Sequence, residues 1–165
     1  MTALSQNLLL LTLTFAACRV NGQVGDQVIR QIVLEKAIVD SSFIFGKWTE
    51  KGGTETHLTY LGQVTTKHGQ TFRVLNSIWF WGLSRRATAG ILIFTADNAY
   101  VGKYSVTVIS DLPTKLKNGN LIFKNSGNDC EPQNVTVVDL KNGLPKQFFK
   151  KCHGAYGDIY CFDNE

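Results

Sequence analysis

The sequence lacks several features that would place it in a class of protein at once. It has no apolar run of the ~20 residues that a helix needs to cross a bilayer. It has no Gly-x-Ser-x-Gly, no His-Glu-x-x-His and no phosphate-binding loop, the motifs of common hydrolases, zinc proteases and nucleotide-binding proteins. Its 17 Lys and Arg residues are mixed with 13 Asp and Glu residues, without the dense basic stripe that nucleic-acid binding requires. We therefore expect no membrane-spanning helix, no nucleic-acid partner and no cofactor.

The first 22 residues have the pattern of a secretory leader. Residues 8–17 form an apolar run of the length typical of the core of a signal peptide. Val20-Asn21-Gly22 places small or modest side chains before Gln23, which predicts cleavage after Gly22. The mature protein is therefore expected to begin at Gln23 and to be secreted or periplasmic.

The leader also contains a second possible processing site. Phe15-Ala16-Ala17-Cys18 resembles a bacterial lipobox, in which the cysteine is lipidated and becomes the first residue. Such a lipid anchor at Cys18 would leave the domain outside the membrane but tethered to its surface. Residues 23–165 have the length of one domain with its own core in either case.

The leader implies an oxidising compartment, and the cysteines that follow it leave their pairing open. Cys130, Cys152 and Cys161 follow the leader, so one internal disulfide and one remaining thiol are expected. Cys152 and Cys161 flank the Gly-rich segment 153–158, which favours a bridge that closes a terminal hairpin. Pairing of Cys130 with either of the other two is the alternative.

The chain is expected to be mainly β. Segment 26–39 has apolar residues at helical spacing and an aspartate that can cap it, which favours one short N-terminal helix. Its many β-branched residues make a strand the alternative. The segments that follow alternate with Gly and Asn turns, and they predict strands at 43–50, 54–66, 70–81, 88–95, 100–109, 114–116, 121–123, 135–140 and 158–162.

Strands in sequence order with no helix between them predict an antiparallel meander of about eight strands, either a barrel or a sandwich. Asn118-Gly119 is the strongest local hairpin signal, because both central residues of the turn must adopt positive φ. Asp111-Leu112-Pro113 interrupts the strands and marks a corner where the chain changes sheet.

The densest aromatic cluster lies in segment 78–81. On a strand, Trp79 and Trp81 share one face, and an aromatic pair of this kind can stack on a sugar or another flat ligand. Arg85 and Arg86 in the following loop are then the polar partners of the ligand. Because both faces of the strand are apolar here, the same pattern also fits a central strand covered on both sides, followed by a solvated basic turn.

Gly46-Lys47-Trp48 stands at the start of the strand run. This Gly-x-Trp is similar to the signature of the lipocalins, secreted up-and-down barrels that hold small apolar ligands. The resemblance implies a barrel whose closed end is plugged by Trp48, a structural role for Gly46 and Trp48. The C-terminal part departs from that family, because Gly-rich turns and a strand stand where the family has a long helix.

These residues support two classes of function. The first is an exported, non-enzymatic β domain that binds a small ligand, a glycan or a protein partner. The second is a small thiol-dependent enzyme or hydrolase, in which a histidine such as His57 or His68 activates Cys152. The histidines have no metal-ligand spacing, so no metal site is expected. The absence of a catalytic motif favours the binding domain.

Overall fold

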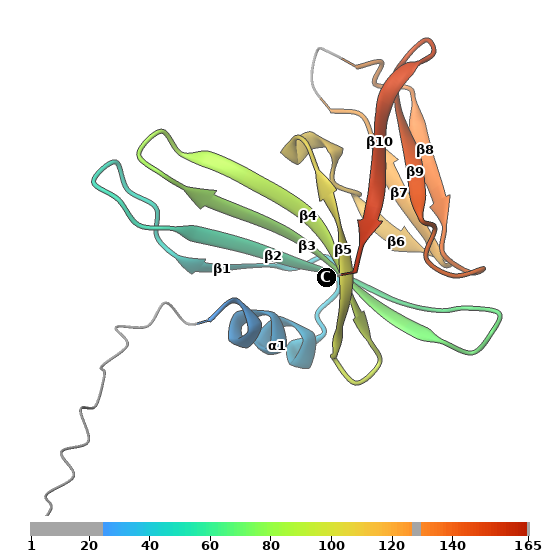
Figure 1. The fold of residues 1–165 in the computed structure, drawn as a ribbon, viewed down its shortest axis with the longest axis horizontal. Coiled ribbons are helices and arrows are strands. Elements are labelled where there is room, and N and C mark those ends of the chain that lie inside the picture. Colours follow the sequence, from blue (N-terminus) through green and yellow to red (C-terminus); the bar gives the residue numbers. More distant parts are fainter. Residues whose placement is uncertain (1–24, 127–129, 165) are drawn as a thin grey trace, which may run out of the picture.

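The computed structural model describes residues 25–126 and 130–164. The leader, the cut after Gly22 and Cys18 therefore lie outside the described residues, and their assignments stay predictions. The described chain folds into one α-helix, ten strands and a short 3-10 turn (Figure 1). The elements are α1 (Asp26–Lys36), β1 (Ser42–Gly46), β2 (Glu55–Thr65), β3 (Thr71–Trp81), β4 (Arg86–Thr95), β5 (Tyr100–Val106), η1 (Ile109–Asp111), β6 (Lys115–Lys117), β7 (Asn120–Lys124), β8 (Val135–Asp139), β9 (Gln147–His153) and β10 (Tyr156–Asp163).

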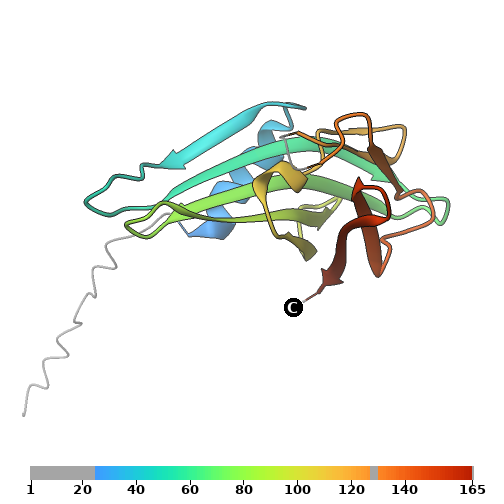
Figure 2. The same cartoon turned by 90° about the horizontal axis from the view of Figure 1, so that it is seen from above.

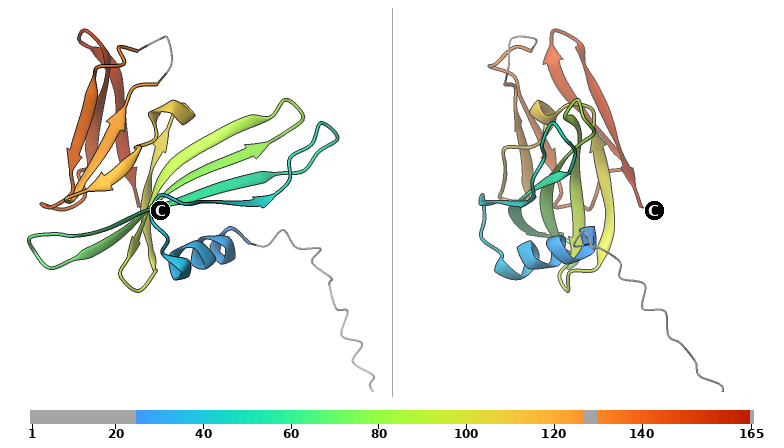
Figure 3. Two further views of the ribbon diagram at one scale, coloured as in Figure 1. Left: turned by 180° about the vertical axis from the view of Figure 1, so that it is seen from behind. Right: turned by 90° about the vertical axis from the view of Figure 1, so that its left-hand side faces the viewer.

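The N-terminal helix is present and shorter than predicted. It begins after Gly25, and Asp26 lies in its first turn, where it accepts a hydrogen bond from Arg30, instead of capping the helix. The helix ends where Ala37 adopts a left-handed conformation with φ of 49°. The helix lies on one side of the large sheet (Figures 1 and 3), and its buried apolar residues pack against that face.

The predicted antiparallel meander forms a seven-stranded sheet with the order β1-β2-β3-β4-β5-β10-β9. The long strands β2, β3 and β4 lie side by side, as Figure 2 shows from above. β10 joins β5 through only two residue pairs, Phe162–Tyr104 and Asp163–Lys103. The β9–β10 hairpin therefore extends away from the β1–β4 part of the sheet (Figure 1).

The expected change of sheet at Asp111-Leu112-Pro113 is confirmed. After β5 the chain passes through η1 and enters a three-stranded sheet with the order β6-β7-β8. The hairpin expected at Asn118-Gly119 joins β6 to β7, with φ of 51° and 74° at the two residues. The first two strands of the small sheet are thus placed by a strong local turn.

Two apolar cores hold these layers together. The larger core lies between the two sheets and includes the β9–β10 hairpin, and its fully buried members include Tyr104, Leu121 and Phe123. The smaller core lies between α1 and the opposite face of the large sheet, where Leu75 of β3 packs with Val33 and Leu34. The seven-stranded sheet is thus covered by the helix on one face and by the small sheet on the other.

The barrel alternative is wrong, because the large sheet stays open between its edge strands β1 and β9. The plugging role implied for Trp48 by the lipocalin resemblance fails with it. Trp48 is half-buried in the loop after β1, and its indole Nε1 donates to the carbonyl of Gly82 at 2.7 Å. Gly46 ends β1 with φ of 75°, where an added Cβ would meet the Thr54 carbonyl oxygen.

Strand β9 was not among the predicted strands, and its register explains why the favoured disulfide is wrong. The hairpin turn is so tight that Cys161 lies opposite Gln147 and not opposite Cys152. The side chain of Cys152 instead reaches Cys130, with which it forms the disulfide across a Cα–Cα distance of 4.6 Å. Cys161 is an exposed free cysteine. The bridge therefore ties β9 to the segment between β7 and β8.

Candidate ligand-binding site

The two tryptophans of β3 form an open aromatic surface. Trp79 and Trp81 lie on the face of the sheet that carries α1, and their rings stack with centroids 5.7 Å apart and an interplanar angle of 25°. Helix α1 covers Leu75 on this face but leaves Trp79 42% exposed. The prediction that this end of β3 is covered on both sides is therefore wrong, and an indole face is available to a ligand.

Trp79 also lines a groove of about 810 Å³ between the first turn of α1 and the ends of β1 and β2. The groove combines backbone, apolar and polar groups, a mixture typical of small-ligand sites. Its lining residues are Gly25, Asp26, Ile29, Phe45, Gly46, Lys47, Gly53, Thr54, Thr56 and Trp79. A ligand that stacks on Trp79 would therefore have room to extend beneath the helix.

A smaller hollow of about 130 Å³ lies on the other side of Trp79 and is rich in hydroxyl groups. Thr56, Ser77, Thr88 and Ser105 contribute hydroxyls from four adjacent strands, and Lys103 adds a cation. The first turn of α1 closes one side of the hollow. Hydrogen-bonding groups of both donor and acceptor type thus surround an exposed indole.

The structure separates the two arginines that were predicted to act together. Arg86 pairs with Trp81 across β3 and β4, and its guanidinium lies 5.5 Å from the ring centroid. Arg85 turns to the opposite face, where it lies 4.8 Å from the Phe80 ring and 5.4 Å from the Trp48 ring. Trp79, Trp81 and Arg86 therefore form one site, the tryptophan platform, and Arg85 is not part of it.

Arg85 belongs to a small charged cluster behind the platform. The His57 ring nitrogen Nε2 lies 2.7 Å from Glu55 Oε1, and Arg85 lies 3.9 Å from the same oxygen. The hydrogen bond with His57 is the largest cause that lowers the pKa of Glu55 below its usual value. His57 is thus hydrogen-bonded to Glu55, a carboxylate on its own strand.

The thiol-enzyme alternative loses its nucleophile in this structure. Cys152 is bonded to Cys130 and has no thiolate with which to attack a substrate. Among the described residues the remaining thiol is that of Cys161, which is exposed on β10. Within residues 25–126 and 130–164, no group of three or more His, Cys, Asp and Glu side chains could hold a metal ion.

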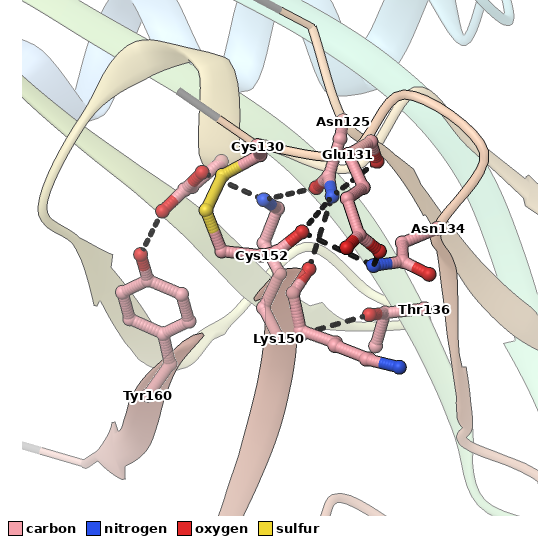
Figure 4. Close-up of polar contacts among 10 residues, drawn as sticks. Asn125, Cys130, Glu131, Asn134, Thr136, Lys150, Cys152 and Tyr160 are labelled. Atoms are coloured by element: carbon pink, nitrogen blue, oxygen red, sulfur yellow. Dashed lines mark hydrogen bonds and ion pairs between the residues drawn. A yellow bond between two sulfur atoms is a disulfide. The ribbon is translucent and has the colours of Figure 1, made fainter. Parts of the chain in front are cut away.

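A buried polar cluster beside the disulfide was not predicted from the sequence (Figure 4). Lys150 of β9 is only 3% exposed, and its Nζ lies 2.8 Å from Asp111 Oδ1 and 2.8 Å from Asn125 Oδ1. The Tyr160 hydroxyl donates to the second Asp111 oxygen. Burial, followed by this hydrogen bond to the Asp111 carboxylate, raises the pKa of Tyr160. We call Asp111, Asn125, Lys150 and Tyr160 the buried cluster.

One signal in the sequence could have revealed part of this cluster. Phe148, Lys150 and Cys152 alternate along β9 and share its inward face. A lysine on the same inward face of a strand as a core phenylalanine is unusual, because a buried ammonium needs a partner. Its partners Asp111 and Asn125 come from a corner and a loop, and no local pattern connects them to Lys150.

Comparisons with known proteins give no family for this chain. No protein-family model, no curated protein and no solved structure matches it.

Proposed function

We propose that this chain is an exported, non-enzymatic domain that binds glycans on the tryptophan platform. The observation that carries the proposal is the open stacking of Trp79 on Trp81 beside a groove of about 810 Å³. A large aromatic face left exposed next to a groove is costly in water and is typical of binding sites. The Arg86 guanidinium beside Trp81 extends the platform with hydrogen-bond donors.

The chemistry around the platform fits a sugar better than a purely apolar ligand. A pyranose ring has an apolar C–H face that stacks on an indole and a rim of hydroxyls that needs hydrogen-bond partners. Thr56, Ser77 and Thr88 supply such partners around Trp79. A small apolar ligand or a protein partner on the same surface is the alternative within the binding class.

The disulfide supports the part of the proposal that concerns export. The disulfide between Cys130 and Cys152 persists in oxidising compartments, which agrees with the predicted leader. No helix within the described part of the chain is long and apolar enough to cross a membrane. The proposal therefore places the domain in the secreted or periplasmic space, with a lipid anchor at Cys18 as the alternative.

The test is a screen of the mature protein on an oligosaccharide array, followed by titration of each hit with tryptophan fluorescence as the readout. Trp79→Ala should weaken binding of a hit by about fivefold, because one stacked aromatic contact contributes roughly 1 kcal/mol. Tyr156→Ala is the matched control, since Tyr156 is an aromatic residue 72% exposed on a distant hairpin. Equal affinities of Trp79→Ala and the wild type would refute the platform. Selective uptake of apolar molecules would favour the alternative ligand class.

A further inference from the structure

The buried cluster brings an amine, a carboxamide and a carboxylate into direct contact. Lys150, Asp111 and Asn125 are 3%, 5% and 8% exposed. The Lys150 amine lies between the other two side chains, 2.8 Å from one oxygen of each (Figure 4). An ammonium–carboxylate pair removed from water costs free energy, so burial favours transfer of a proton from the Lys150 ammonium to the Asp111 carboxylate, which leaves both groups neutral.

The carboxamide of Asn125 is fixed in one orientation. Its Nδ2 donates to the main-chain carbonyls of Glu131, Lys151 and Cys152 at 3.0, 3.2 and 3.1 Å. These bonds hold the carboxamide with Oδ1 directed at the Lys150 amine. The carbonyl carbon Cγ, which is bonded to Oδ1, is therefore held close to the amine as well. An amine held against a carbonyl group in a fixed geometry gains the large rate advantage of an intramolecular reaction.

The Asp111 carboxylate is held in a similar way. The Tyr160 hydroxyl donates to Oδ2, which leaves Oδ1 directed at the Lys150 amine. A carboxylate at this position can accept a proton from the amine and pass it on, as a general base and then a general acid.

We propose that Lys150 and Asn125 form an intramolecular isopeptide bond and that Asp111 is its catalytic residue. The Lys150 ammonium gives a proton to Asp111 and becomes a neutral amine. The amine lone pair attacks Cγ of Asn125, the new C–N bond forms, and the carbonyl electrons move onto Oδ1. When the carbonyl is restored, the bond from Cγ to Nδ2 breaks.

The atoms and charges of this step balance without a further reactant. Of the three protons on the Lys150 ammonium, one stays on the new amide nitrogen. The other two pass through Asp111 to Nδ2, which leaves as ammonium, and Asp111 ends as a carboxylate. The three main-chain carbonyls around Nδ2 accept hydrogen bonds from this nitrogen. This inference is independent of glycan binding, because the tryptophan platform lies on the other face of the sheet.

The test is a peptide map of the reduced wild-type protein by mass spectrometry. The bond makes the protein lighter by one ammonia, and trypsin cannot cleave after an acylated Lys150. We expect a branched peptide in which residues 125–141 are joined to residues 147–151. Cyclisation of Gln23 or a succinimide at Asn118 would also release ammonia, so the branched peptide and not the total mass decides. Unmodified residues 125–141 together with cleavage after Lys150 would overturn the proposal.

Two variants test the role of Asp111. Asp111→Asn keeps the size of the side chain but cannot carry the proton, and it should yield no branched peptide. Lys151→Arg changes the exposed neighbour of Lys150 and should retain the branched peptide in full. A branched peptide in folded Asp111→Asn would refute the catalytic assignment. The wild-type map tests the bond itself even where a variant fails to fold.

Discussion

Tyr104 and Tyr160 are two buried phenols of the large core, and we expect them to make its stability depend on alkaline pH. Burial raises the pKa of both phenols, and Tyr104 also donates to the carbonyl of Pro145 at 2.7 Å. A raised pKa means that the folded state holds the phenol proton more tightly than the unfolded chain does. The stability that this provides is complete below the unfolded pKa of about 10 and is lost as the pH rises above it.

Tyr104→Phe should therefore make the protein less sensitive to alkali. The variant loses one buried hydrogen bond and is expected to be less stable by about 1 kcal/mol near neutral pH. Its free energy of unfolding in urea should then fall less than that of the wild type between about pH 9 and about pH 11. Tyr156→Phe, at an exposed position, should follow the wild type. An equal alkaline loss in Tyr104→Phe and the wild type would contradict the assignment.

Roles that depend on residues close in the sequence were predictable, and roles that depend on residues far apart in the sequence were not. Asn118 and Gly119 set a turn whose geometry depends only on themselves, so the sequence pattern sufficed. Lys150 is buried because Asp111 and Asn125, 39 and 25 positions earlier in the chain, approach it in the fold. The pairing of Cys152 failed for the same reason, because it depends on the register of β9 against β10.

Among the elements, helix α1 carries a local strain at its C-terminal end. Ala37 adopts φ of 49°, and its N–H donates to the carbonyl of Val33 at 3.0 Å. An L-residue with a Cβ is disfavoured in this left-handed conformation, whereas glycine accepts it. The helix therefore ends with an alanine in the left-handed conformation that glycine usually adopts at this position.

Ala37→Gly should stabilise the protein by roughly 0.5–1 kcal/mol, because relief of the left-handed strain exceeds the added flexibility of the unfolded chain. Thermal and urea unfolding measure the change. Lys36→Gly is the matched control one position earlier, inside the helix, where glycine should destabilise by about 1 kcal/mol. Losses of stability in both variants would show that Ala37 is not strained.

The elements themselves were predicted with uneven success, and the clarity of their sequence patterns explains the difference. The helix and the long strands β2 to β4 have clear periodicity and strong turns between them. β9 has the sequence Gln-Phe-Phe-Lys-Lys-Cys-His, and a lysine at an inward position hides the alternation of a buried strand. The tryptophan platform was recognised as an aromatic face, but the sequence could not tell how far α1 extends over it.

At the scale of the whole molecule, two cross-links are expected to close nearly the same loop. The disulfide joins positions 130 and 152, and the proposed isopeptide bond joins positions 125 and 150. A cross-link stabilises mainly by restricting the unfolded chain, so the second closure of one loop adds little. Removal of one cross-link should therefore lower the free energy of unfolding only slightly as long as the other is present.

Reduction of the disulfide should cost about 3 kcal/mol of unfolding free energy in Asp111→Asn, where only the disulfide closes the loop of 22-residue separation. In the wild type, with the isopeptide bond formed, the cost should be clearly smaller. Urea unfolding with and without a reductant gives both values. Cys161→Ser is the control, since Cys161 takes no part in the bridge. Equal costs in the two backgrounds would count against a shared loop.

The position of β10 has a consequence for how the molecule is made. Although it is the last described strand, β10 lies inside the large sheet, between β5 and β9. Its end also packs closely on β5, where a Cβ on Gly102 would collide with the carbonyl oxygen of Asp163. The sheet therefore cannot be completed before residues 156–163 have been synthesised, and its contacts are long-range ones that form slowly. Until then, β5 is an open edge and β9 has no partner strand in the large sheet, so we expect a nascent chain stalled before residue 156 to be prone to aggregation and to degradation by quality-control proteases.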